Sequence, residues 1–219
     1  MVNKEAYLQI KGECEAQGVT LVAVSKIKPN EDIMALYELG QRDFGENYVQ
    51  ELMEKHEALP KDIRWHFIGH LQSNKVKYIT DFVHLIHGVD SEKLLKEVNK
   101  QAAKNGKVIS CLLQMHIAKE ETKFGMDETE VAVVMNSLET YKNVSVQGFM
   151  GMASFSDDLN VVKEEFNFLK SVFDKYVISS SANGQIKTLS MGMSGDYKLA
   201  METGSNMVRI GSLLFGARL

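Results

Sequence analysis

The sequence predicts a single (β/α)8 TIM barrel, an α/β fold, over residues 1–219 as one domain. Short apolar segments alternate with amphipathic stretches, and eight such segments can be counted, as in a barrel of parallel strands. No linker rich in proline, glycine or serine interrupts this alternation. A doubly wound open sheet would also alternate, but no GxGxxG motif follows the first predicted strand.

The strands are expected where β-branched and other apolar residues cluster. The first, over residues 20–26, is TLVAVSK, and the eighth, over residues 206–210, is NMVRI. The other six are expected at residues 42–47, 65–70, 83–89, 108–117, 144–153 and 188–193.

Capping residues and helical spacing place the helices between the strands. Three helices are expected to begin at a polar cap: Asn30 (through Leu39), Ser91 (ended by Asn105-Gly106) and Asp127 (with Glu130 at the spacing of a capping box, before 131–138). A fourth is defined by apolar residues at helical spacing: Val162, Phe166, Leu169, Phe173 and Tyr176. The remaining helices are expected over residues 3–17, near 48–58 and 74–80, and over 196–204 and 212–216.

Composition and charge exclude several functional classes. A formal net charge of -4 provides no global field that would attract nucleic acid or an anionic membrane. The sequence shows neither a signal-peptide pattern nor a segment of transmembrane length, so we expect a cytoplasmic protein. Cys14 and Cys111 lack metal or disulfide spacing and are expected to be reduced thiols. A closed barrel also leads us to expect a monomer.

Lys26 is the first candidate functional residue, because TIM barrels carry their sites at the carboxyl ends of the strands. Val22, Val24 and Lys26 share a face by the two-residue period, so an inward Val22 would bring the Lys26 amine to the barrel mouth. Burial lowers the pKa of a lysine, and the neutral amine forms a Schiff base with an aldehyde. The alternative is a lysine that only snorkels at a strand end.

The loops after the seventh and eighth strands are candidate phosphate binders, as in many TIM barrels. Residues 193–196 (MSGD) follow the seventh strand, and residues 211–212 (GS) follow the eighth. Small residues let backbone N–H groups approach an anion, although ordinary turns have the same composition. Arg209, near the end of the eighth strand, could face a pyridine nitrogen or a phosphate, or pair with a barrel acid such as Glu46.

Histidines and further lysines complete the candidates. Five histidines lie in the predicted strands: His66, His70, His84, His87 and His116. No HExxH motif or carboxylate at metal spacing accompanies them, so we expect packed or hydrogen-bonded histidines and no metal site. Lys75, Lys77 and Lys123 lie in predicted loops or helix starts, where solvated lysine is the default, and contact with an anionic ligand stays open.

Several long motifs occur in order along the chain: AVSKIKPNEDI (23–33), DFGENYVQEL (43–52), WHFIGHLQSNK (65–75), IHGVDS (86–91), ETKFGM (121–126) and LSMGMSGDYKLAMETGSNMVRIGSLLFG (189–216). Together they resemble the pyridoxal phosphate homeostasis proteins, the YggS/PROSC family, over about residues 7–218. The resemblance implies a barrel like the N-terminal domain of alanine racemase. This is the type III fold of pyridoxal 5'-phosphate (PLP) enzymes, here without the C-terminal β domain.

The resemblance also implies which residues bind the cofactor. Lys26 would hold PLP as a Schiff base, Ser194, Gly211 and Ser212 would hold its phosphate, and Arg209 would face the pyridine nitrogen. Three more residues would surround the ring, with Asn47 beside it and His66 and Met191 in the pocket wall.

For function, the resemblance implies binding and storage of PLP in vitamin B6 homeostasis rather than catalysis. An alanine-racemase-like enzyme needs two bases on opposite faces of the cofactor, and in that family the second comes from the C-terminal domain that we do not expect here. An arginine at the ring nitrogen also leaves that nitrogen unprotonated, which disfavours carbanion chemistry. Delivery to PLP-dependent apo-enzymes is the partner hypothesis. The alternatives are a racemase-like PLP enzyme and a PLP-free, phosphate-binding barrel isomerase.

Overall fold

A computed structural model describes residues 2–120, 124–177 and 185–216. Its strands run parallel and close into one barrel in the order β1-β2-β3-β4-β5-β6-β7-β8, which confirms the predicted fold. The strands are β1 Thr20–Val24, β2 Asp43–Glu46, β3 Arg64–Phe67, β4 Leu85–Val89, β5 Ile109–Met115, β6 Val144–Gly151, β7 Thr188–Ser190 and β8 Met207–Ile210. The barrel closes where β8 pairs with β1, with Val22 opposite Arg209.

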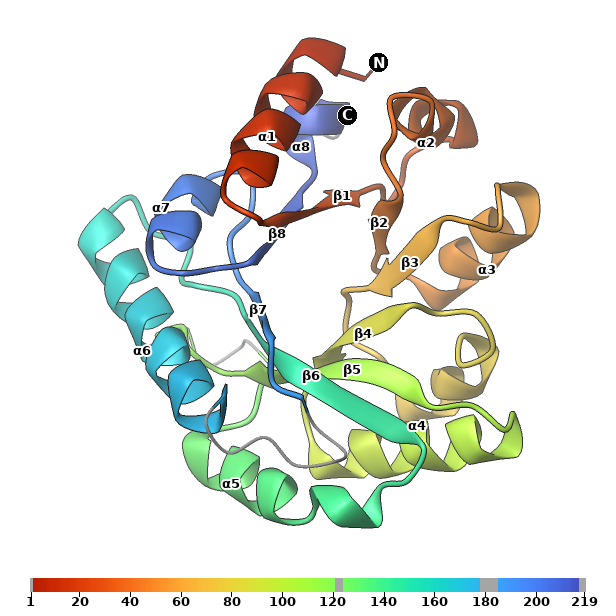
Figure 1. The fold of residues 1–219 in the computed structure, drawn as a ribbon, viewed down its shortest axis with the longest axis vertical. Helices are drawn as coiled ribbons and strands as arrows, with labels where there is room; N and C mark the ends of the chain where they lie inside the picture. The colour runs from red at the N-terminus through yellow and green to blue at the C-terminus, as the bar shows by residue number, and fades with distance from the viewer. Residues whose placement is uncertain (1, 121–123, 178–184, 217–219) are drawn as a thin grey trace.

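Helices surround the barrel as an outer layer (Figure 1). They are α1 Lys4–Ala16, α2 Asn30–Tyr37, α3 Val49–Ala58, α4 Glu92–Lys104, α5 Glu128–Asn136, α6 Leu159–Val177, α7 Tyr197–Glu202 and α8 Ser212–Phe215, with two 3-10 helices, η1 Ser73–Tyr78 and η2 Leu138–Thr140. Helix α1 packs against α8, which brings the two ends of the barrel sequence together. None of these helices has both the length and the apolar character required to span a bilayer.

Two of the three predicted caps are confirmed. The Ser91 hydroxyl accepts from the Leu94 amide at 3.3 Å, and Asp127 and Glu130 form a complete capping box at the start of α5. The prediction for Asn30 was wrong, because Pro29 occupies the N-cap position in an extended conformation and Asn30 is already helical. Proline fits this boundary since it donates no amide hydrogen bond.

The strands are shorter than their apolar segments suggested, mainly at the barrel mouth. Strand β1 ends at Val24, β3 at Phe67 and β7 at Ser190. The residues that follow turn into loops; for example, the Lys28 amide donates to the Ser25 carbonyl at 3.1 Å. Lys26 and residues 193–196 therefore lie on loops at the carboxyl end of the barrel, where a TIM barrel carries its functional groups.

Alternation along the strands separates an outer core from the barrel interior. Leu21 and Ala23 belong to the large core between barrel and helices, whereas Val22 belongs to a small inner cluster. That cluster is completed by Leu85, Leu112, Met150 and Met207. The rest of the interior contains buried polar residues, among them His66, His87, Ser190 and Arg209. Cys14 and Cys111 are buried free thiols.

Candidate functional site

A cavity of about 440 Å³ lies at the carboxyl mouth of the barrel, and six of the eight predicted site residues line it. These six are Lys26, Asn47, Ser194, Arg209, Gly211 and Ser212. They come from β8, from the loops that follow β1, β2, β7 and β8, and from the first residue of α8, so the closed sheet brings together residues far apart in the sequence.

The lining of this cavity has the character of an anion site with apolar walls. Its described residues include three cationic side chains, Lys26, Lys28 and Arg209, and no carboxylate. The apolar part of the wall consists of Val24, Ile68, Met152, Phe155 and Met193. The Asn47 Oδ1 atom is buried without a hydrogen-bond partner. A ligand that donates a hydrogen bond in this cavity would satisfy it. This cavity suits a flat, anionic molecule: the cationic side chains would bind its charge, and the apolar wall would pack against its ring.

The turn that carries Lys26 is held on both sides by acidic residues. On one side, the Ser25 hydroxyl donates to Glu46 Oε1 at 2.5 Å. On the other, the Ile27 amide donates to Glu51 Oε1 at 2.6 Å. Ile27 also has a φ of 59°, a left-handed conformation that is unusual for a β-branched residue. The backbone on either side of Lys26 is therefore fixed by specific contacts, which directs the lysine toward the cavity.

Glu46 belongs to this anchoring network and not to the cavity. The Lys55 ammonium donates to Glu46 Oε1 at 2.8 Å and to the Ser25 carbonyl at 2.8 Å. Burial raises the pKa of Glu46 to about 7, while Lys55 and Ser25 oppose that rise. The alternative in which Arg209 pairs with Glu46 is therefore wrong, since Glu46 contacts Ser25 and Lys55 instead.

Arg209 is buried and bound by neutral oxygens. Its Nη1 donates to the Ser190 carbonyl at 2.8 Å and to the Ser190 hydroxyl at 2.6 Å, and its Nη2 donates to the Gly151 carbonyl at 3.0 Å. Burial lowers the pKa of the guanidinium to about 10, and Asp196 acts in the opposite direction. Arg209 is consequently positive at neutral pH and presents its charge at the base of the cavity.

Two predicted wall residues lie elsewhere. Met191 is completely buried in the outer core, on the opposite side of its strand segment from Ser190. His66 points into the barrel but lies below the cavity, with Nε2 3.0 Å from Asp43 Oδ1 and Nδ1 2.9 Å from His87 Nε2. Ile68, the next residue on the same face of this segment, lines the cavity in its place.

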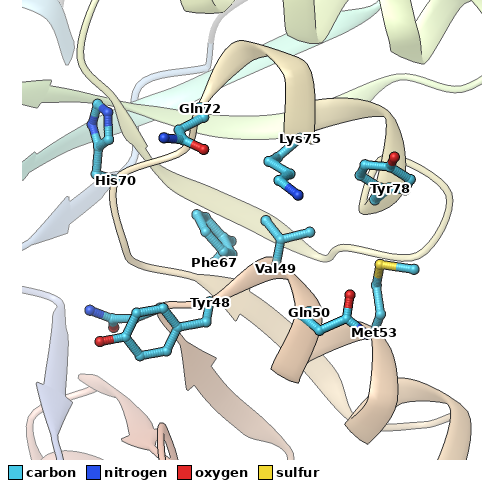
Figure 2. A pocket seen from close by; sticks show the side chains of 10 residues that line it. Tyr48, Val49, Gln50, Met53, Phe67, His70, Gln72, Lys75 and Tyr78 are labelled. Carbon is cyan, nitrogen blue, oxygen red and sulfur yellow. The ribbon is translucent and has the colours of Figure 1, made fainter.

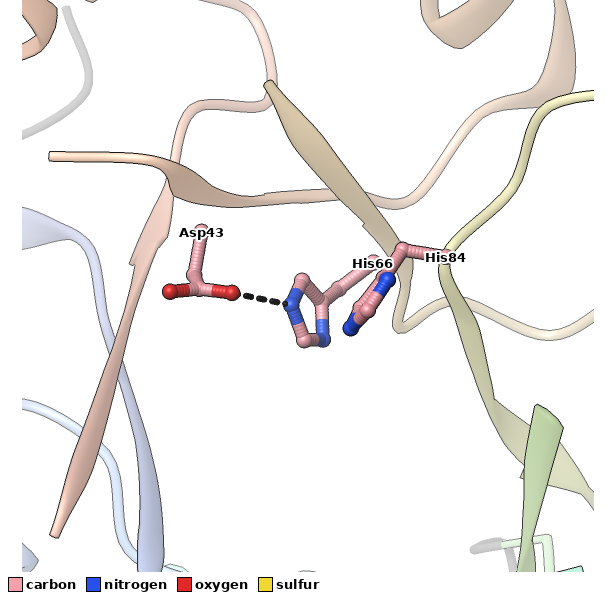
Figure 3. A group of neighbouring side chains, drawn as sticks. All are labelled: Asp43, His66 and His84. Carbon is pink, nitrogen blue, oxygen red and sulfur yellow. Dashed lines mark hydrogen bonds and ion pairs between the residues drawn. The ribbon is translucent and has the colours of Figure 1, made fainter. Parts of the chain in front are cut away.

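Asp43, His66 and His84 gather at the amino-terminal end of the barrel (Figure 3), with potential ligand atoms within 4.8 Å of one another. Arg64 contacts both carboxylate oxygens of Asp43, at 2.7 and 2.5 Å. Burial alone would raise the pKa of Asp43, but hydrogen bonds from His66 and Arg64, together with the charge of Arg64, lower it to about 2. Because both His66 nitrogens are also engaged, the group forms a hydrogen-bonded, charge-compensated cluster.

A second, larger cavity of about 590 Å³ adjoins the first and shares Asn47 with it (Figure 2). Its other lining residues are Tyr48, Val49, Gln50, Met53, Phe67, His70, Gln72, Lys75 and Tyr78. This larger cavity has one lysine in its described lining, whereas the smaller one has two lysines and an arginine. Lys26, Arg209 and the two small-residue loops are not among its lining residues. The smaller cavity is therefore the better candidate for the functional site.

The remaining lysines and histidines take other positions. The ammonium groups of Lys75 and Lys77 lie 5.7 and 4.9 Å from the centre of the Tyr78 ring, and Lys123 lies outside the described residues. His70 was expected in the third strand, but β3 ends at Phe67. His70 stacks on Phe124 with ring centroids 4.1 Å apart, and its Nδ1 lies 3.0 Å from Asp90 Oδ2.

Several lining residues were missed in the sequence. Ile68 could have been found from the two-residue period, because it follows His66 on one face. Lys28 lies two residues after the predicted Lys26, so its proximity in the sequence was a usable signal. Phe155 had no local signal, since it lies in a loop and is fully exposed.

Comparisons with known proteins agree with this arrangement. Residues 4–219 match the family described as alanine racemase, N-terminal domain. The pyridoxal phosphate homeostasis protein of Aquifex aeolicus is 38% identical over 216 residues, which cover 96% of this chain and 94% of that protein. The protein of the same name from Schizosaccharomyces pombe is 37% identical, with 96% and 89% covered.

Solved structures give the same result. PipY of Synechococcus elongatus without PLP superposes with a TM-score of 0.91 at 30% identity, covering 97% of this chain and 99% of that one. PipY with PLP bound gives 0.82 at 32% identity, covering 91% and 93%. Alanine racemase of Bartonella henselae, at 15% identity and a TM-score of 0.73, shares the fold; 60% of its chain is covered. The chain thus belongs to the pyridoxal phosphate homeostasis protein family, built on the alanine racemase N-terminal domain.

Proposed function

We propose that this chain binds PLP in the cavity at the barrel mouth, with Lys26 as the attachment residue, and serves PLP homeostasis as a carrier. One observation carries the proposal: a lysine held on a fixed turn lines the same cavity as Arg209 and two loops of small residues. The printed names of the relatives and the PLP-bound PipY structure support the choice of ligand.

The residues present fit PLP in three respects. Cationic lining without a described carboxylate suits a phosphate group. Ser194, Ser212 and the backbone at Gly195 and Gly211 provide donors at one end of the cavity, and the Gly211 amide already donates to the Ser194 hydroxyl at 3.3 Å. Nothing lies within 4 Å of a Cβ built at Gly195, so this loop leaves room for an anion.

When bound, PLP would supply an aldehyde that attaches reversibly to an amine. This chain would supply the amine of Lys26, donors for the phosphate and a positive group at the ring nitrogen. If Arg209, positive at neutral pH, faced that nitrogen, it would disfavour protonation there, and the ring would draw electrons weakly. The described lining contains no tyrosine or carboxylic acid that could act as a base opposite Lys26. These properties favour storage of PLP over racemisation.

Reduction and peptide mapping test the site. Purified protein is incubated with PLP, its absorption spectrum is recorded, and the complex is reduced with borohydride before the labelled peptide is identified. We expect a yellow protein labelled at Lys26, and no label at this peptide in Lys26→Ala. Lys75→Ala, in the neighbouring cavity, is the matched control and should keep the label. A colourless protein, or label spread over surface lysines, would contradict the proposal.

Carrier function is tested by transfer. Loaded protein is mixed with a PLP-dependent apo-enzyme, and the rate of reactivation is compared with the rate of PLP release into buffer. Reactivation faster than release is expected for direct delivery. Equal rates would limit the protein to storage, and turnover of an amino acid by the loaded protein would instead support the racemase-like alternative.

A further inference from the structure

A column of hydrogen bonds crosses the interior of the barrel from its amino-terminal end to the cavity. Asp43 Oδ1 lies 3.0 Å from His66 Nε2, and His66 Nδ1 lies 2.9 Å from His87 Nε2. His87 Nδ1 lies 3.1 Å from Ser190 Oγ, which accepts from Arg209 Nη1 at 2.6 Å. Five strands, β2, β3, β4, β7 and β8, each contribute one residue to this column.

The column is buried along its whole length. His87 and Ser190 are inaccessible to solvent, and the other three residues are at most 8% exposed. A polar group left unpaired in such an interior is costly, so each link constrains the next. Ser190 is the last link, because its hydroxyl and carbonyl together accept both bonds of Arg209 Nη1.

The two ends of the column fix its direction. A guanidinium can only donate, and a carboxylate can only accept. Burial, reinforced by the positive charge of Arg209, lowers the pKa of His87 well below its usual range, so this imidazole is neutral. Of the two side chains that contact Ser190 Oγ in the described structure, only His87 can accept its hydroxyl hydrogen, because Arg209 has no acceptor. The Ser190 hydroxyl therefore donates to His87 Nδ1, His87 Nε2–H donates to His66 Nδ1, and His66 Nε2–H donates to Asp43.

We propose that Asp43, His66, His87 and Ser190 are positioning residues that hold the Arg209 guanidinium in place for the ring of the bound cofactor. This inference rests on the proposed function, because it assumes that PLP occupies the cavity above Arg209. Asp43 lies at the opposite end of the barrel, and the column is the hydrogen-bonded path that connects it to Arg209.

A double-mutant cycle tests whether the column transmits this influence. The dissociation constant for PLP and the absorption spectrum of the bound form are measured for wild type, Ser190→Ala, Asp43→Asn and the double variant. Loss of one hydrogen bond predicts ~3- to 10-fold weaker binding for Ser190→Ala and, for the remote Asp43→Asn, ~2- to 5-fold. If Asp43 acts through Ser190, then Asp43→Asn has no further effect in the Ser190→Ala background.

Two variants serve as matched controls. Ser205→Ala removes another buried serine between β7 and β8, whose hydroxyl contacts the carbonyls of Leu189, Met191 and Met207 but not the column. Asp62→Asn removes another carboxylate that pairs with an arginine, at 2.8 Å from Arg42. Both should leave the spectrum and the affinity for PLP unchanged. Equal effects of Asp43→Asn in the two backgrounds, or no effect in wild type, would overturn the proposal.

A second measurement does not depend on PLP. Nitrogen NMR of the imidazole rings in the unloaded protein reports which nitrogen carries the proton, and both His66 and His87 are expected to carry it on Nε2. Ser190→Ala should shift the His87 Nδ1 signal, and Ser205→Ala should not. A charged or Nδ1–H His87 would refute the column even if PLP binds at Lys26. Failure of labelling at Lys26 with these tautomers intact would refute the proposed function alone.

Discussion

Two groups of residues in the barrel interior differ in what they contribute. Val22, Leu85, Leu112, Met150 and Met207 form an apolar cluster. A hydrogen-bonded column of polar residues runs from Asp43 to Arg209. Bulky apolar residues dominate TIM-barrel interiors, so the apolar cluster is expected. The polar column needs a separate explanation, because buried polar groups gain little net stability over apolar ones.

The comparison indicates a division of roles within one core. The apolar cluster tolerates changes of side chain that preserve volume, since its contacts have no direction. The polar column admits few substitutions, because each donor needs its acceptor at one distance and angle. The column reaches the cavity through Arg209, and this contact links the polar column to the proposed binding of PLP.

The largest effect on stability is expected in the apolar cluster. Leu112→Ala removes a fully buried side chain from the inner cluster and should lower the free energy of unfolding by about 2–5 kcal/mol. Urea denaturation followed by circular dichroism measures this loss. The folded fraction should retain the wild-type affinity for PLP, because no polar contact changes. Val133→Ala, at a position 55% exposed on α5, is the control and should change stability little.

An intermediate effect is expected at the outer end of the column, and it depends on pH. The pKa of Asp43, lowered from 3.8 to about 2 in the folded protein, corresponds to roughly 2 kcal/mol of stability. Because the folded pKa lies below the unfolded one, this contribution is complete above about pH 4 and disappears as the pH falls toward 2. The free energy of unfolding is measured at several pH values for wild type and Asp43→Asn.

The difference between the two curves isolates Asp43 from the other carboxylates. Asp43→Asn should be less stable than wild type at pH 5, and the gap should shrink as the pH falls through the acid range. Parallel curves would show that Asp43 does not gain stability from Arg64 and His66. Asp62→Asn, which alters an exposed ion pair, should run closer to wild type throughout.

The sequence predicts those features of the fold that depend on residues close together in the chain. The order of strands and helices was predictable because hydrophobic periodicity is local, and Ser91 and Asp127 acted as caps for the same reason. The ends of β1, β3 and β7 were not, because apolar character continues into the loops at the mouth. Pro29 took the N-cap from Asn30 through its fixed φ, which a search for side-chain acceptors overlooks.

The candidate site also contains some features that local sequence patterns predict and others that they do not. The period of two brought Lys26 to the mouth, and the position of residues 193–196 and 211–212 after the last strands indicated an anion site. His66 was assigned to the right face of its strand but to the wrong depth, because periodicity does not say how far along the barrel axis a residue lies. The column beneath Arg209 joins five strands, and no local pattern predicts hydrogen bonds across such separations.

The smallest effect is expected outside the interior, at the turn that directs Lys26. Ile27 has a φ of 59° and is 62% exposed, so its side chain adds little packing while its backbone is strained. Ile27→Gly should relieve about 1–2 kcal/mol of left-handed strain and lose about 0.5–1 kcal/mol through the flexibility of glycine in the unfolded chain. A net gain of up to about 1.5 kcal/mol, seen as a small rise in Tm, follows from these two opposing values. Ile27→Ala is the matched control, because alanine loses the exposed side chain but keeps the strain. A Tm for Ile27→Gly no higher than that for Ile27→Ala would mean that the contact of the Ile27 amide with Glu51, and not backbone strain, dominates at this turn.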